Sequence, residues 1–148
     1  MALSRKKIGG EAPMVVSQVT DTCLYAGFFG TLDSARMKAV TEKILNLLQA
    51  SGIEIIVLDM ANVDLIDSAV ANHLIKIGDT MKLSGVEVVF AGISPIVAQT
   101  MSSAGVDFTK FRVSRDFRSA LKEVFLLQGL ELIPINGNTE QQQQQDRM

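Results

Sequence analysis

The sequence predicts an α/β fold in which a mostly parallel sheet carries one antiparallel strand from an N-terminal hairpin. Two observations predict it. Apolar runs at residues 14–19 and 23–29 flank the polar pair Asp21-Thr22, which is typical of two antiparallel strands joined by a short turn. Beyond this hairpin, helical spacing of apolar residues alternates with β-branched runs, which favours parallel strands joined by right-handed helical crossovers. The expected order is β-β-α-β-α-β-α-β-α.

The length and composition indicate one domain with an aliphatic core. The chain has 148 residues, 47% of them hydrophobic, and it contains no tryptophan. Residues 1–12 are expected to be a flexible lead-in, and residues 13–130 the folded domain. Residues 131–148 include a glutamine-rich run that cannot build a core, so a flexible tail is expected there.

Charge and hydropathy argue against several classes of function. The net charge is -2 and the basic residues are scattered, which argues against nucleic-acid binding. The longest apolar run, residues 53–58, is far shorter than the roughly 20 residues of a membrane-spanning helix, and the start of the chain does not resemble a signal peptide. We therefore expect a cytoplasmic protein without a membrane segment. The lone Cys23 lies in an apolar run, where a buried thiol is expected.

The first helix and the strand after it follow the hairpin. Thr31 is the expected N-cap, and Ser51-Gly52 closes the helix. The apolar residues that recur at helical spacing are Met37, Val40, Ile44, Leu47 and Leu48. Residues 53–58 predict a strand buried on both faces, with Asp59 at its carboxyl end and a loop over residues 60–67.

The second half contains three more helices and two short strands. A helix is expected over residues 68–83, a strand over 86–91, and then a short helix capped by Ser94. Residues 111–113 predict the last strand, and Ser114 is the expected cap of the final helix. The residues expected to face the core are Val70, Leu74, Ile77 and Met81 in the first of these helices, and Phe117, Leu121, Val124 and Phe125 in the last.

The motifs of common enzymes are missing from the sequence. It has no Walker A sequence, no glycine-rich dinucleotide fingerprint and no Gly-x-Ser-x-Gly elbow. Its single histidine, His73, flanks the apolar face of a predicted helix, where a structural role is expected. We therefore expect neither an enzyme nor a bound cofactor or metal.

Asp59 has a position that could carry chemistry, because functional groups collect at the carboxyl ends of parallel strands. It could be the phospho-acceptor of a response-regulator receiver. A receiver, however, begins β-α-β and needs an acidic pair after its first strand and a lysine after its last, and this sequence has neither feature. A carboxylate that caps the following turn is the better interpretation of Asp59.

Asp67 and Ser68 stand where the predicted loop enters a helix, and two interpretations stay open. Their oxygens can cap the helix by accepting its free backbone N–H groups. Alternatively, the Ser68 hydroxyl is phosphorylated, because a helix N-terminus favours the added negative charge. With Asp64 and Asp67 beside it, a phosphate would make this surface strongly negative and would repel or block a binding partner.

Several segments resemble the STAS (anti-sigma-factor antagonist) family. Asp67-Ser68 before a helix, after a strand ending in Asp59, is similar to the hallmark of that family. Residues 88–95 and 98–100 also match, and the similarity covers about residues 13–127. Within the family the sequence is most similar to the stressosome proteins RsbS and RsbR. The resemblance implies the STAS fold, in which helices pack on a mostly parallel sheet.

The resemblance further implies a binding protein that is regulated by phosphorylation. Ser68 is then phosphorylated by a serine/threonine kinase of the RsbT type, and Ser34 falls on a second acceptor position of RsbR proteins. The kinase would contact Asp33, Asp64, Asp67 and Ser68. It would be sequestered until phosphorylation releases it, in a large oligomer with RsbR- and RsbS-like STAS proteins.

Other roles stay open within the same family. A simple antagonist like SpoIIAA would use the same serine but bind an anti-sigma kinase as a monomer or dimer, so particle size would discriminate between the two. A STAS module of an anion transporter is a third role, against which the missing membrane span argues. The length of the chain and Ser68 are typical of RsbS, whereas residues 69–74 are typical of RsbR.

Overall fold

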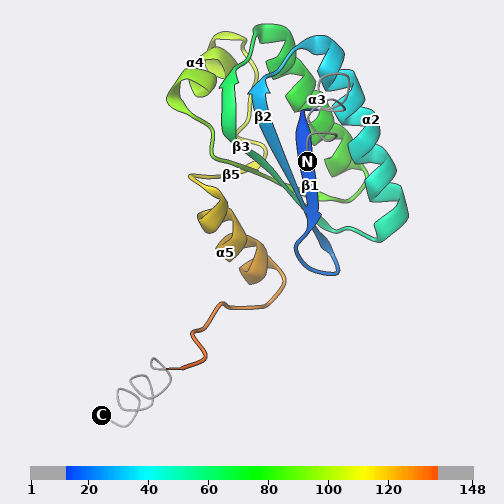
Figure 1. The fold of residues 1–148 in the computed structure, drawn as a ribbon, viewed down its shortest axis with the longest axis vertical. Helices are drawn as coiled ribbons and strands as arrows, with labels where there is room; N and C mark the ends of the chain where they lie inside the picture. The colour runs from blue at the N-terminus through cyan, green and yellow to red at the C-terminus, as the bar shows by residue number, and fades with distance from the viewer. Residues whose placement is uncertain (1–12, 137–148) are drawn as a thin grey trace, which may run out of the picture.

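The computed structural model describes residues 13–136, and its five-stranded sheet has the order β1-β2-β3-β4-β5 (Figure 1). The strands are β1 (Met14–Gln18), β2 (Cys23–Thr31), β3 (Ile55–Leu65), β4 (Glu87–Ala91) and β5 (Arg112–Ser114). β1 pairs antiparallel with β2, and every other pair is parallel. The predicted α/β fold, its hairpin and its element order are confirmed. The expectations for residues 1–12 and for the glutamine-rich run lie outside the described residues.

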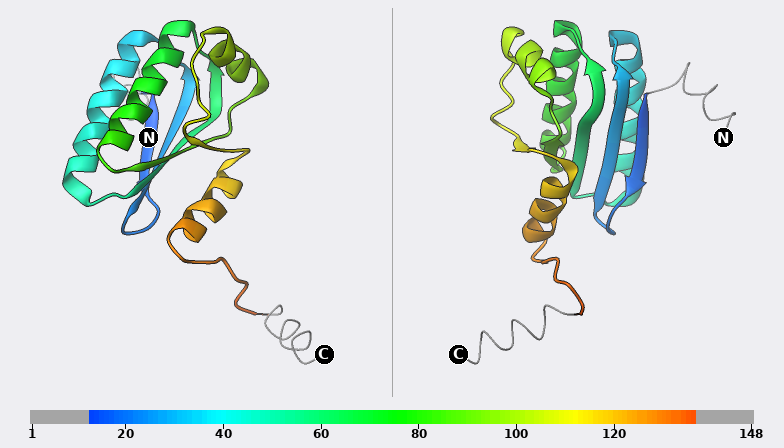
Figure 2. Two further views of the ribbon diagram at one scale, coloured as in Figure 1. Left: turned by 180° about the vertical axis from the view of Figure 1, so that it is seen from behind. Right: turned by 60° about the vertical axis from the view of Figure 1, so that its left-hand side comes forward.

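Helices cover both faces of this sheet (Figure 2). They are α2 (Ser34–Ser51), α3 (Ser68–Leu83), α4 (Pro95–Ser103) and α5 (Phe117–Leu127). α2, α3 and α4 contribute side chains to the large apolar cluster on one face, and α5 contributes to a smaller cluster on the other. None of the helices within residues 13–136 combines the length and the apolar character needed to cross a bilayer.

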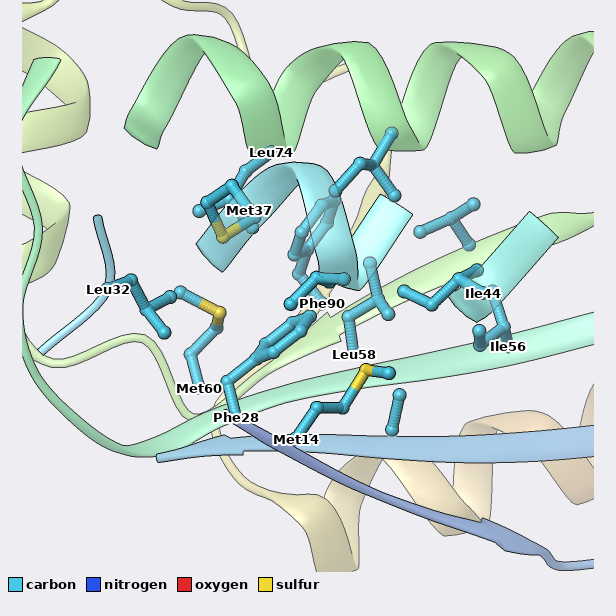
Figure 3. Packing of buried hydrophobic residues seen from close by; sticks show 14 of the residues in the cluster. Met14, Phe28, Leu32, Met37, Ile44, Ile56, Leu58, Met60, Leu74 and Phe90 are labelled. Atoms are coloured by element: carbon cyan, nitrogen blue, oxygen red, sulfur yellow. The ribbon is translucent and has the colours of Figure 1, made fainter. Parts of the chain in front are cut away.

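The large cluster arises from the alternation of side chains along the strands. Leu24 and Phe28 of β2 point to the same face as Leu58 of β3 and Phe90 of β4, because residues two apart in a strand share a face. Figure 3 shows Phe28, Leu58 and Phe90 of the sheet on the side where Met37 of α2 lies, within the same cluster. The predicted aliphatic core is therefore present, and α2 and α3 bury the apolar stripes that the sequence indicated.

The smaller cluster lies under α5. Ile55 and Val57 of β3 face it, together with Cys23 of β2. Cys23 has no exposed surface, as predicted, and the strand run is buried on both faces, also as predicted. From α5 itself, Val124 is fully buried, whereas Leu121, which was expected to face inward, is only partly covered.

β3 is longer than the sequence predicted. The strand extends to Leu65, so most of the expected loop over residues 60–67 is strand, and Asp59 lies inside β3 rather than at its end. β2 is the reason, because its own last residues continue the pairing past an irregularity in register. Phe29 lies opposite Asn62 there, and Thr31 lies opposite Leu65. Backbone pairing with β2 thus holds as strand a segment that the sequence analysis expected to be a loop.

Two of the expected helix caps were wrong. Thr31 is the last residue of β2, and the N-cap of α2 is Asp33. Ser114 is the last residue of β5, where its hydroxyl donates to a carboxylate of α5, and the N-cap of α5 is Asp116. In both cases the residue that the sequence singled out is held by strand pairing, and the first aspartate beyond the strand takes the cap. The predicted cap Ser94 is confirmed.

Candidate functional site

The same three-residue sequence, Asp-Ser-Ala, opens two helices of the fold. It occurs at residues 33–35, where α2 begins, and at residues 67–69, where α3 begins. In each copy the aspartate is the N-cap. The first accepts a 2.9 Å hydrogen bond from the N–H of Arg36, and the second accepts one of 2.8 Å from the N–H of Val70. This duplication is visible in the sequence as repeated letters, but it was not among the predicted features.

The aspartates cap the two helices, so the serines that follow them do not serve as N-caps. Ser34 and Ser68 are the first helical residues of α2 and α3, and both are exposed. In the described part of the chain, neither serine hydroxyl takes part in a hydrogen bond that we identify. The capping role that the sequence divided between Asp67 and Ser68 therefore belongs to Asp67, and the Ser68 hydroxyl is exposed beside the cap.

The two helices start at one edge of the sheet, the edge formed by the carboxyl ends of its parallel strands. β2 and β3 are parallel neighbours, and their last residues, Thr31 and Leu65, are paired. The N–H of Leu32 also donates to the carbonyl of Leu65 across 3.4 Å. Each helix begins within three residues of this junction, so Ser34 and Ser68, the first residues of α2 and α3, follow adjacent strand ends. Figure 1 shows the two helices side by side.

Carboxylates surround this edge. Asp33, Asp64 and Asp67 are all exposed, and Asp64 belongs to the last residues of β3 rather than to a loop. A second oxygen of Asp33 pairs with the guanidinium of Arg36 at 3.5 Å. The four residues that the sequence assigned to partner binding, these three aspartates and Ser68, are thus brought to the same edge of the sheet.

A groove between α2 and α3 runs beside Ser34. Its volume is about 610 Å³, and its lining residues are Ser34, Ala35, Lys38, Thr41 and Glu42 of α2 and His73 of α3. His73 is half-buried at the flank of α3, as expected. Sequence reasoning missed the groove. The spacing of Ser34 and Lys38, four residues apart on one helix, was the only signal of it.

Asp59 belongs to a different part of the molecule. It is 6% exposed on the α5 side of the sheet, where its carboxylate accepts a 2.7 Å hydrogen bond from the Tyr25 hydroxyl and a 3.0 Å bond from the N–H of Ala61. Burial, and then the hydrogen bond and charge of Asp59, raise the pKa of Tyr25 to about 12. Asp59 thus holds the irregular part of β3, and both its oxygens are engaged.

Metal-ligating side chains do not gather within residues 13–136. No group of three histidine, cysteine, aspartate or glutamate residues in that range could hold a metal ion. Cys23 is fully buried, and burial raises its pKa to about 11, which disfavours the thiolate that binds metals.

A protein-family model for the STAS domain matches residues 14–120. The chain belongs to the STAS domain family. Among curated relatives, RsbT co-antagonist protein RsbRD of Bacillus subtilis is 28% identical over 118 residues, which is 80% of this chain and 42% of that protein. RsbRA of the same organism is 31% identical over 97 residues, 63% of this chain and 35% of that protein. This STAS chain therefore spans less than half the length of these RsbR relatives.

Solved structures show the same STAS fold. A serine-to-glutamate variant of RsbS from Moorella thermoacetica has a TM-score of 0.70 at 23% identity, covering 80% of this chain and 100% of that chain. A chain of the stressosome has a TM-score of 0.63 at 22% identity, covering 76% and 97%. The anti-sigma factor antagonist SpoIIAA in its unphosphorylated form also scores 0.63, at 15% identity, covering 75% and 95%.

Proposed function

We propose that this STAS domain acts in the cytoplasm by binding a serine/threonine kinase of the RsbT type, and that phosphorylation of Ser68 releases the kinase. The observation that carries the proposal is the division of labour at the start of α3. Asp67 satisfies the N–H of Val70, while the neighbouring Ser68 hydroxyl is exposed on the first helical residue. A kinase can modify such a hydroxyl without removing the helix cap.

The position of Ser68 suits a switch that works through charge. The positive end of the α3 dipole favours a phosphate there, so the fold tolerates the modification. Asp64 and Asp67 are already negative, and a phosphate adds a charge of about -2 to the same edge. A partner that fits the unmodified edge meets like-charge repulsion and the cost of desolvating the phosphate after modification.

Ser34 is the second acceptor of this proposal. It has the same position relative to its capping aspartate as Ser68, and the pairing of β2 with β3 brings both serines to one edge. One bound kinase could therefore cover both hydroxyls, with Asp33 contributing to the same contact surface.

The likeness to known proteins supports the kind of partner and assembly. The RsbR relatives are named as co-antagonists of RsbT, which supports an RsbT-type partner. The likeness of this fold to that of a stressosome chain supports the proposal that the protein forms an oligomer with RsbR- and RsbS-like STAS proteins. The TM-score to SpoIIAA, which equals that to the stressosome chain, favours a second candidate, a simple antagonist of an anti-sigma kinase. The two differ in mass, because the simple antagonist would run near 16.0 kDa or twice that mass.

The test is phosphosite mapping by mass spectrometry after incubation with ATP and a GHKL-type serine/threonine kinase of the RsbT type. We expect phosphate on Ser68, its loss in Ser68→Ala, and normal phosphorylation in Ser17→Ala, which removes an exposed serine of β1. Kinase capture on beads should be strong for unmodified protein and weak after phosphorylation. An active kinase that leaves Ser68 unmodified, or that stays bound after modification, would overturn the proposal.

A further inference from the structure

The two Asp-Ser-Ala motifs differ one helical turn after the serine. Residues four apart on a helix lie on the same face, so Lys38 follows Ser34 and Asn72 follows Ser68. Lys38 is exposed on α2 and lines the groove together with Ser34. The Asn72 side chain donates a 2.9 Å hydrogen bond to the carbonyl of Ser68, so its amide is bound to the helix backbone and it carries no charge. Only Ser34 therefore has a cation one turn below it.

A second potential cation lines the groove from the neighbouring helix. His73 of α3 lines the same groove as Ser34 and Lys38. On its own helix, His73 is five residues after Ser68, which turns it about 140° away from that serine at 100° per residue. The single histidine of the chain thus shares a groove with the first serine and is turned away from the second.

The remaining charges also differ between the two serines. Around Ser34, the negative charge of Asp33 is paired with Arg36, and the one carboxylate that lines the groove, Glu42, lies one turn beyond Lys38 and two turns from Ser34. Around Ser68 lie Asp64 and Asp67, and no ion pair that we identify in the described residues offsets either carboxylate. A dianion on Ser34 would have Lys38 between it and the carboxylate of Glu42, whereas a dianion on Ser68 would lie directly beside two carboxylates.

We propose that the groove between α2 and α3 is a phosphate-binding site that receives a phosphate carried by Ser34 and has no counterpart for one carried by Ser68. Lys38 and the protonated imidazole of His73 donate hydrogen bonds to the phosphate oxygens, which are strong, charge-assisted bonds. This inference deepens the proposed function, because it rests on Ser34 as an acceptor. The phosphate on Ser34 is then held against its own domain, and the phosphate on Ser68 stays exposed as the repulsive charge.

The test installs phosphoserine during translation at position 34 or at position 68 of the full chain, so that no kinase is needed. Because His73 is the only histidine, the imidazole signals in the NMR spectrum report it alone. We expect phosphate on Ser34 to shift these imidazole signals at a fixed pH, because the phosphate would lie in the groove that His73 lines. Phosphate on Ser68 should leave them unchanged.

Matched variants remove the lysine below Ser34 and place a lysine at the equivalent position below Ser68. Lys38→Gln should raise the second pKa of the Ser34 phosphate, and Asn72→Lys should lower the second pKa of the Ser68 phosphate. Phosphorus NMR measures both values. Lys122→Gln, on α5, should change neither. Equal effects of the two phosphates on His73, or no effect of the Ser34 phosphate, would refute the groove as a phosphate site. A kinase that ignores both serines would instead refute the proposed function.

Discussion

The N–H of Leu32 donates a hydrogen bond to the carbonyl of Leu65 across 3.4 Å, just beyond the last paired residues of β2 and β3. This bond joins the segment that enters α2 to the segment that enters α3. Both helices therefore start from one hydrogen-bonded junction, and both serines lie at the same edge of the sheet. The switch that we propose depends on this shared edge, since a partner bound there contacts both helix starts.

Ser68→Asp should weaken kinase binding by about tenfold or more, corresponding to roughly 1.4 kcal/mol. An added carboxylate beside Asp64 and Asp67 repels an acidic partner surface, although it carries less charge than phosphate. Isothermal titration calorimetry at two salt concentrations measures the effect, which should shrink as salt screens the charges. Ser17→Asp, on β1, is the control, and equal weakening by both variants would contradict the prediction.

Asp67→Ala should lower the free energy of unfolding by about 1 kcal/mol, because the N–H of Val70 loses its capping acceptor. Asp64→Ala removes the same charge three residues earlier from an exposed position without a cap, and it should cost less than about 0.5 kcal/mol. Urea unfolding of both variants separates capping from charge. If the two variants were equally stable, the cap assigned to Asp67 would be wrong.

Gly78→Ala should destabilise the protein even though alanine is the better helix former. A Cβ on Gly78 would lie 2.5 Å from the ring of Phe111, so the ring must move. The gain in helix propensity is about 1 kcal/mol, whereas overpacking of a buried contact typically costs about 1–3 kcal/mol. Thermal unfolding should show a lower Tm, and Phe111→Leu in the same chain should recover part of the loss.

The stabilising contribution of Tyr25 should be lost in strong alkali. Its pKa is raised to about 12 in the folded protein, above the ordinary value of 10.0, so the unfolded chain releases the phenolic proton first. The stability that Tyr25 contributes is complete below pH 10 and is lost as the pH rises toward 12. Tyr25 is the only tyrosine, so the ultraviolet absorbance of tyrosinate reports it alone. A native midpoint near the ordinary value would contradict this assignment.

The bounds of the longer elements could be predicted where local signals agree. For α3 a capping aspartate, apolar residues at helical spacing and a terminating Ser84-Gly85 all indicated residues 68–83, and the structure has that helix. For β3 the sequence did not predict the full length, because residues 60–65 mix Asn62 and Asp64 with apolar residues and yet pair with β2. The cap of α2 was wrong for a related reason, since Thr31 belongs to that same extended pairing.

By itself, the sequence determined the order of the elements, the aliphatic core and Ser68 as a helix-start serine, because periodicity and capping are properties of neighbouring residues. Only the tertiary structure decided that Ser34 and Ser68 share one edge, since that depends on the parallel register of β2 with β3. It likewise decided that Lys38 and His73 line one groove beside Ser34. These two residues lie on different helices, and the packing of α2 against α3 brings them together.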